Sequence, residues 1–469
     1  MRTRRRLVSQ RWSSLNFDRA RVLGSEEDDD GHTGCVNALS WARDGELLLS
    51  AGDDRTVRVW RMDPTVDEDY PFLCRGILHT GHMANIFNAH MLPHSSNIAT
   101  VAGDRQVRVH EMGQVRQYGP PADSRTDAKH SCIRRLRCHD GRVKRLVTED
   151  SPHLFLTVSE DGTVRQHDLR TPPHDCSEDA CPPPLIKVDF PLSTMAFSSL
   201  TSYQFVVAGE SEYGYLFDRR HAGRFLKEER GMVENGMTHC VRRFGRRSPN
   251  SGGYREHITG ARMSSQNGHE LLLSYSGDAV YLYSTRDDAE DKSMSSKRPR
   301  DDSSSDTEDD TDSMSDHDPW LAQDAYSGVP LIMPRAQFAG ARNVATIKDV
   351  NFLGPDDEFV TSGSDDGHFF VWRKKDGALQ GLFEGDGSVV NVIEGHPHLP
   401  LVAASGIDTT VKLFAPVSGP SAFSRMDSAD RIISSNANQA KFSRRVRGPD
   451  LSALLAAAVS DDSAECTHQ

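Results

Sequence analysis

The sequence contains no apolar run that approaches the roughly 18 residues of a membrane-spanning helix. No hydrophobic signal segment follows Met1, although the start, which contains many Arg and Ser residues, shares features with a mitochondrial transit peptide. Cysteine is scarce, with 8 scattered copies in 469 residues, which suits a reducing compartment better than a framework of disulfides. We therefore expect a soluble protein of the nucleus, with the cytoplasm as a second location.

The sequence also lacks the short motifs of common enzyme classes. It has no phosphate-binding glycine loop, no HExxH and no G-x-S-x-G. The HDCSEDAC segment offers His174, Cys176 and Cys181, but a structural zinc site needs four ligands at tighter spacing. The formal net charge of −13 disfavours direct binding to nucleic acid. These absences predict a protein that is not an enzyme and that carries no metal or cofactor.

What the sequence does contain is a short pattern that returns along the chain. Each copy has a small residue, an acidic turn, and an alternating strand that ends on an aromatic residue or His; the clearest copies are Ser50–Trp60, Val101–His110, Ser159–Asp168, Ser362–Trp372 and Ser405–Phe414. Their spacing is consistent with propeller blades of about 40–45 residues plus insertions. The sequence therefore predicts an all-β fold, a seven-bladed WD-repeat β-propeller.

We expect this propeller to occupy residues 31–416, after a short helical N-terminal arm at residues 1–30. Because a propeller must hide its sheet edges, the segment before His32 and the strand near Val411 to Phe414 are expected to share one blade. The tail, residues 417–469, is predicted to hold a short helix that starts at Asp450.

Residues 286–335, between blades five and six, form an acidic insert that lacks strand alternation. Its low apolar content predicts disorder. Ser305, Thr307 and Ser313 each have an acidic residue three positions later, which suits phosphorylation by an acidophilic kinase. The KRPR run at Lys297 to Arg300 is either a nuclear-import signal or a solvated cluster of charge.

The acidic residue about six positions before the end of each copy is expected to lie in a tight turn. It is Asp54, Asp104, Asp161, Asp366 and Asp408 in the five clear copies. There the carboxylate can accept hydrogen bonds from turn amides or from a His on the preceding loop. Because the pattern recurs, we interpret these acids as structural rather than catalytic.

Two consecutive blades end differently from the others. Blade three ends in His167-Asp168-Leu169-Arg170 and blade four in Phe217-Asp218-Arg219-Arg220, so both contain an Asp-x-Arg sequence. The Asp is expected to begin a turn, and the Arg to project onto one rim of the ring. Since Arg is over-represented among interface hot spots, the pair predicts a protein-binding rim.

These motifs, together with SGSDDGHFFVW and HPHLPLVAASGIDTTVKLFAP, make the sequence resemble WD-repeat substrate receptors of cullin-4 RING ubiquitin ligases. The resemblance is strongest to the subgroup of the nuclear-receptor-interaction protein and the WD and tetratricopeptide repeat protein, without the tetratricopeptide part. It implies that Asp168, Arg170, Asp218 and Arg220 contact the damaged-DNA-binding adaptor protein of the ligase. It also implies that the N-terminal arm enters a cleft of that adaptor, with Leu7, Trp12, Leu15 and Phe17 as apolar anchors.

The leading hypothesis is thus a non-catalytic receptor that presents target proteins for ubiquitination. The alternative is a nuclear, chromatin-associated WD-repeat scaffold without a ligase role, in which the acidic insert and the basic arm would be the working parts. The identity of the target protein cannot be read from the sequence, because target contacts come from variable rim loops.

Overall fold

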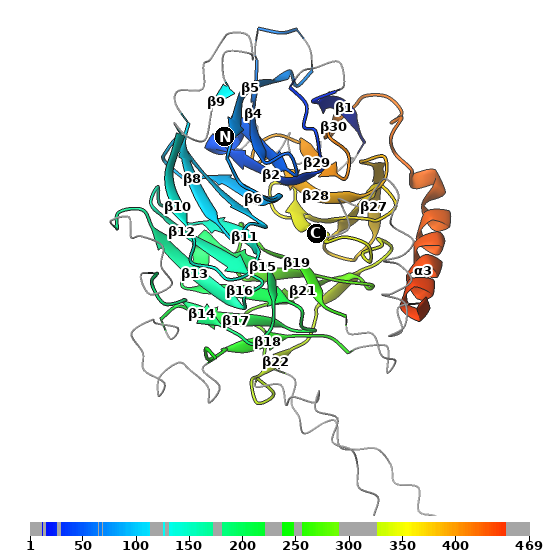
Figure 1. The fold of residues 1–469 in the computed structure, drawn as a ribbon. Helices are drawn as coiled ribbons and strands as arrows, with labels where there is room; N and C mark the ends of the chain where they lie inside the picture. The colour runs from blue at the N-terminus through cyan, green and yellow to red at the C-terminus, as the bar shows by residue number, and fades with distance from the viewer. Residues whose placement is uncertain are drawn as a thin grey trace, which may run out of the picture.

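A computed structural model describes residue 12 and residues 16–25, 30–63, 65–67, 69–112, 125–126, 131–171, 181–220, 237–247, 256–289 and 326–446. In these ranges the chain forms seven sheets of four or five strands, arranged in a ring (Figure 1). The predicted seven-bladed β-propeller is confirmed.

The first three blades follow one another along the chain. Blade one contains β2 (Val36–Ala42), β3 (Leu47–Gly52), β4 (Thr56–Met62), β5 (Phe72–His79) and the short β9 (Arg125–Thr126). Blade two contains β6 (Ile86–Met91), β7 (Asn97–Ala102), β8 (Val107–Glu111) and β10 (Cys132–Leu136). Blade three contains β11 (Val143–Thr148), β12 (Leu154–Ser159), β13 (Thr163–Asp168) and β14 (Ile186–Lys187).

The next three blades repeat this plan. Blade four contains β15 (Leu192–Phe197), β16 (Gln204–Gly209), β17 (Gly214–Asp218), β18 (Arg242–Phe244) and β22 (Leu331–Ile332). Blade five contains β19 (Ile258–Met263), β20 (Glu270–Tyr275), β21 (Val280–Ser284) and β23 (Ala336–Phe338). Blade six contains β24 (Val350–Leu353), β25 (Phe359–Gly363), β26 (His368–Arg373) and β27 (Leu379–Glu384).

Blade seven closes the ring by joining the two ends of the propeller. Its strands β28 (Val390–Gly395), β29 (Val402–Gly406) and β30 (Val411–Pro416) are completed by β1 (Phe17–Leu23), which pairs antiparallel with β30. This confirms the expected sharing of a blade, because β1 covers the edge that β30 would otherwise expose. It also corrects the predicted boundary: residues 17–23 form a propeller strand and are not part of a helical arm.

The core lies between neighbouring blades. The innermost strand of each blade contacts the innermost strand of the next around the whole ring, from β2 and β6 to β28 and β2. Between blades one and two, for example, Leu49 and Val57 belong to the same buried cluster as Ile86 and Ile98. Each such side chain contributes about 1.5–3 kcal/mol when fully buried, so the blades stabilise one another.

The C-terminal segment crosses the outside of blade six and continues into helix α3 (Ala429–Val446), which lies at the edge of the ring (Figure 1). Ala429 is buried with Phe370 and Trp372, and Ile433 packs against the same cluster. Asn436 donates a hydrogen bond to the Gly340 carbonyl at 3.0 Å. The tail therefore contains a helix, but upstream of the one predicted at Asp450, which lies outside the described residues.

The acidic insert is shorter than predicted at its C-terminal end. Tyr326 is buried with its ring 5.1 Å from that of Tyr215, and β22 extends the sheet of blade four by pairing with β18. Residues 326–335 therefore belong to the propeller, because their apolar side chains complete its core. Residues 290–325, including Ser305, Thr307 and Ser313, lie outside the described part of the chain.

Across the ranges given above, no helix has both the length and the apolar character needed to cross a lipid bilayer.

Candidate functional site

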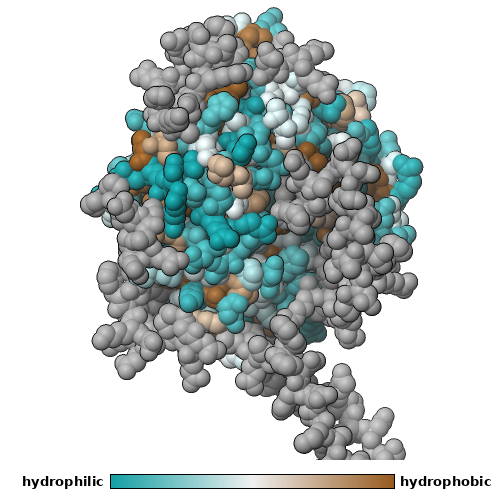
Figure 2. Space-filling view, in the orientation of Figure 1, coloured by the Kyte–Doolittle hydropathy of each residue, from teal (hydrophilic) through white to brown (hydrophobic). Residues whose placement is uncertain are grey.

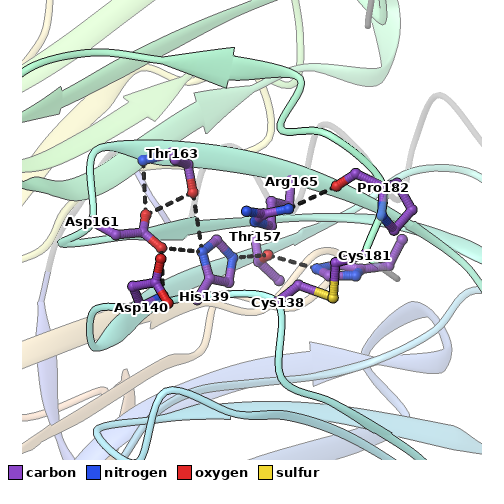
Figure 3. Close-up of a disulfide and its surroundings, with 10 residues drawn as sticks. Cys138, His139, Asp140, Thr157, Asp161, Thr163, Arg165, Cys181 and Pro182 are labelled. Carbon is purple, nitrogen blue, oxygen red and sulfur yellow. Dashed lines mark hydrogen bonds and ion pairs between the residues drawn. A yellow bond between two sulfur atoms is a disulfide. The ribbon is translucent and has the colours of Figure 1, made fainter. Parts of the chain in front are cut away.

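One rim of the ring carries a repeated hydrogen-bond network at the turn acids. In blade three the His139 ring lies between Asp161, at 2.9 Å from Nδ1, and Thr157, at 2.8 Å from Nε2 (Figure 3). Burial acts to raise the pKa of Asp161, but the hydrogen bonds from His139 and Thr163 outweigh it and hold that pKa well below its usual value. The carboxylate is therefore ionised and fixed in the turn.

Blades one and two contain the same network with small variations. His32 contacts Asp54 at 2.9 Å and Ser50 at 2.8 Å, and His82 contacts Asp104 at 3.0 Å and Thr100 at 2.9 Å. Burial lowers the pKa of both His32 and His82, so the rings are neutral at neutral pH. An arrangement of His, Asp and hydroxyl that recurs from blade to blade stabilises the turns, as expected of a structural element.

The turn acids of blades six and seven have other partners. Asp366 accepts a hydrogen bond from Asn436 of α3 at 2.7 Å, so it fastens the C-terminal helix. Asp408 pairs with Lys412 and contacts the neighbouring Asp386. Lys412 lies on β30, four residues after Asp408. Asn436 and Asp386 lie far from these acids in the sequence, on α3 and in the connection between β27 and β28, so the repeat pattern does not identify them.

The opposite rim carries the two Asp-x-Arg turns. Asp168 ends β13 and Asp218 ends β17, and both strands run in the same direction across neighbouring blades. Arg170 donates from Nε and Nη2 to the two oxygens of Asp168 at 2.9 and 2.8 Å. Arg220 donates from Nε to Asp218 at 2.9 Å and is also paired with it through Nη2 at 2.5 Å.

Both arginine side chains are open to solvent, 61% for Arg170 and 64% for Arg220. The hydrogen bond from Arg170 is the main reason that the pKa of Asp168 is lowered, so this carboxylate is ionised too. Each guanidinium is thus held by a carboxylate on one side while the rest faces outward. The two arginines project from the same rim of adjacent blades, as the sequence predicted.

Arg219, the residue between Asp218 and Arg220, joins the blade-four turn to blade three. It forms an ion pair with Glu149 at 3.0 Å and donates a hydrogen bond to Gln166 at 2.6 Å, and both of these residues belong to blade three. The Asp-x-Arg turn of blade four is therefore fixed against blade three. In the sequence, Arg219 is visible only as the variable residue of the Asp-x-Arg motif, so its contacts with blade three could not be predicted.

Cavities of about 310 and 280 Å³ lie where the innermost strands end on this same rim. Both are lined by His90, Arg262 and Glu394, and Arg262 is paired with Glu394 at 2.6 Å. The face of the ring that Figure 2 shows is mainly hydrophilic, and its hydrophobic residues form small separate groups. A partner that binds this face would therefore meet apolar side chains only in small patches.

The predicted apolar anchors of the N-terminal arm are placed differently from expectation. Trp12 is buried, with its ring 5.1 Å from Phe17 and 6.3 Å from Phe359. Trp12 and Phe17 belong to the propeller core, which corrects the expectation that they stand free as anchors. Leu7 and Leu15 lie outside the described residues, and their role stays a prediction.

The cysteines also differ from expectation, because Cys138 and Cys181 form a disulfide (Figure 3). The bond joins the loop just before His139 to the segment that leads into β14, where Pro182 accepts a hydrogen bond from Arg165 at 2.7 Å. Composition alone favoured reduced thiols, and a separation of 43 residues gave no sign of pairing. Among the residues with described positions, no group of three or more His, Cys, Asp or Glu could hold a metal ion.

Three segments of the chain match a known family of sequence repeats. Three segments, residues 27–61, 130–168 and 338–373, match the family described as "WD domain, G-beta repeat". They coincide with blades one, three and six. The chain contains WD repeats.

The chain is similar to several curated proteins, two of which are WD-repeat proteins by name. It is 35% identical over 271 residues to the WD repeat protein iqw1 of Schizosaccharomyces pombe, and the aligned region covers 55% of this chain and 32% of that protein. It is 36% identical over 177 residues to the mouse WD and tetratricopeptide repeats protein 1, covering 35% of this chain and 23% of the relative. It is 28% identical over 260 residues to human DDB1- and CUL4-associated factor 6, covering 55% and 27%.

The chain therefore spans about a quarter to a third of the length of these relatives. The expected resemblance is confirmed at the level of homology to WD-repeat proteins, a group that includes a protein named for association with DDB1 and CUL4.

Proposed function

We propose that this WD-repeat propeller is a non-catalytic substrate receptor that docks on a DDB1-type adaptor of a cullin-4 ubiquitin ligase. The rim that carries Arg170 and Arg220 holds the adaptor. The opposite rim, or the central channel, presents a target protein to the other subunits for ubiquitin transfer.

The observation that carries this proposal is the pair of solvent-exposed arginines on adjacent blades, each oriented by its own carboxylate. A guanidinium that is already oriented loses little side-chain freedom on binding, which favours affinity. The name of the relative, human DDB1- and CUL4-associated factor 6, supports DDB1 as the kind of partner. A platform that only binds is also consistent with turn networks that repeat from blade to blade.

The test is the affinity of the full chain for purified DDB1, measured by biolayer interferometry with the unchanged protein and with the double variant Arg170→Ala/Arg220→Ala. We expect the double variant to bind at least tenfold more weakly, because Arg truncation at an interface centre is among the most costly changes. Its melting temperature should stay close to that of the unchanged protein, since both side chains are exposed.

The matched control is Arg55→Ala/Arg105→Ala. These arginines are also exposed and also lie on adjacent blades, but in the turns between β3 and β4 and between β7 and β8, on the opposite rim. We expect this control to bind DDB1 as the unchanged protein does. Equal binding by both double variants would show that the Asp-x-Arg rim does not hold the adaptor.

A further inference from the structure

Large apolar side chains are seldom exposed in the described part of the chain, and two of the most exposed lie close together. Leu200 is 58% and Tyr203 41% exposed, and both come from the connection between β15 and β16 in blade four. Isolated exposed apolar residues are common on protein surfaces, so their position is what matters. This connection lies on the same rim as Arg170 and Arg220, because β15 and β17 end there and β16 begins there.

The connection is held in place by polar contacts, so Leu200 faces outward from a fixed backbone. The Ser198 hydroxyl accepts a hydrogen bond from the Leu200 amide at 3.3 Å and begins the short helix η4 (Ser199–Thr201). The Thr201 hydroxyl donates to the Gly268 carbonyl of blade five at 2.9 Å. Blades four and five together therefore set the orientation of Leu200.

Tyr203 joins this apolar pair to the arginine rim. The Arg220 guanidinium lies 4.2 Å from the centre of the Tyr203 ring while its nitrogens bind Asp218. Arg219 ties this turn to blade three, which carries Arg170. The four side chains of Arg170, Arg220, Tyr203 and Leu200 therefore lie on one rim of two neighbouring blades. Arg and Tyr, together with Trp, are enriched among interface hot spots.

We infer that Leu200 and Tyr203 form the apolar half of the adaptor-docking surface, beside the cationic half formed by Arg170 and Arg220. This inference rests on the proposed function and extends it across blade four towards blade five. The occupant is DDB1, because the apolar pair is continuous with the rim assigned to it and Arg220 belongs to both halves. The contacting part of DDB1 should pair an acidic group with an apolar recess, which would receive Leu200.

The experiment measures the affinity of the full chain for purified DDB1 after Leu200→Asp and, separately, Tyr203→Ala. We expect at least a tenfold loss for Leu200→Asp, because a charge replaces an apolar contact, and a loss of about fivefold for Tyr203→Ala. Leu200→Ser is the second variant, for use if Leu200→Asp lowers the melting temperature. The control is Met83→Asp: Met83 is 75% exposed but lies on the opposite rim, and we expect it to bind unchanged.

The outcomes separate this inference from the proposed function. If the unchanged chain binds DDB1 and Arg170→Ala/Arg220→Ala weakens it, but the Leu200 and Tyr203 variants bind normally, the apolar half is wrong and the function stands. If the Met83 control loses as much affinity as the Leu200 variants, the inference is also overturned. If the unchanged chain does not bind DDB1, both fail.

Discussion

Blade three has an aspartate near each end of strand β13, and the partners of the two carboxylates differ in their exposure to solvent. Asp161 precedes the strand, and its partner His139 is fully buried. Asp168 ends the strand, and its partner Arg170 is 61% exposed. Both are ionised and both are paired at under 3 Å, but one pair faces the protein interior and the other faces solvent.

The difference separates stability from recognition. A buried carboxylate cannot lose its hydrogen-bond partner without a large cost, because its charge then stays unpaired in a poorly solvated place. An exposed pair adds little stability, but it can hold a side chain in the orientation that a partner needs. The first kind recurs in blades one, two and three, whereas the second occurs on blades three and four.

The largest expected effect is on the buried pair. His139→Ala leaves Asp161 and Thr157 without their shared partner and opens a cavity, so we expect the free energy of unfolding to fall by about 3–4 kcal/mol. Denaturant titration measures this. Binding of DDB1 by the folded protein should be unchanged, because the opposite rim is untouched.

The control for that prediction is His94→Ala. His94 and Asp150 form a His–Asp pair of similar length, 2.7 Å, but their side chains are 69% and 81% exposed. We expect a loss of less than about 0.5 kcal/mol. Similar losses for the two variants would mean that burial does not distinguish the two kinds of pair.

The second prediction concerns the disulfide beside His139. Cys138→Ser opens a covalent loop of 43 residues, and we expect the oxidised protein to lose about 2–4 kcal/mol of unfolding free energy. Under reducing conditions the variant and the unchanged protein should have the same stability. Cys132→Ser, at a free cysteine, is the control and should show no dependence on redox conditions. A difference that persists in reductant would show that packing, and not the bond, is responsible.

These two sites also show what could be predicted from the sequence. Asp161 was recognisable because the same residue type returns at the same place in successive copies, and repetition reveals structural positions. Cys138 and Cys181 were not paired in advance, because a contact across 43 residues depends on how blade three closes. Trp12 and Phe17 both pack in the propeller core, although the sequence predicts them as anchors for a partner. The sequence alone does not distinguish a segment that packs on its own propeller from an arm that enters another protein.

The Asp-x-Arg turns lie between these cases. Their place at the strand ends followed from the repeat, so Arg170 and Arg220 could be expected on one rim. Arg219 was overlooked because its partners, Glu149 and Gln166, belong to the neighbouring blade. Leu200 and Tyr203 have no signal of their own, since exposure is known only once the connection between β15 and β16 is folded.

The third prediction uses pH to examine a buried acid that lacks a histidine partner. Burial, reinforced by the hydrogen bond with Asp408, raises the pKa of Asp386 to about 7, although Lys412 opposes the shift. The folded protein therefore binds a proton more tightly than the unfolded chain, whose pKa is near 3.8. Stability from this group is fully present below about pH 4 and is lost as the pH rises to about 7.

We expect Asp386→Asn to remove this dependence, so that it gains about 1–2 kcal/mol relative to the unchanged protein between pH 5 and pH 7. Denaturant titrations at several pH values measure the change. Asp376→Asn, at an exposed acid, should give a curve parallel to that of the unchanged protein. A parallel curve for Asp386→Asn as well would contradict the assignment.

The smallest expected effect on stability is at the exposed end of β13. Asp168→Asn weakens the charged hydrogen bonds that orient Arg170 but leaves the arginine in place. We expect the melting temperature to change by no more than about 2 °C, because an exposed pair contributes little. The affinity for DDB1 should fall about threefold to tenfold, less than after removal of both arginines, since the guanidinium must then be ordered on binding. If Asp168→Asn lowers stability as His139→Ala does and leaves DDB1 affinity unchanged, the carboxylate at this end of β13 is structural, and the contrast between the two rims fails where it is most direct.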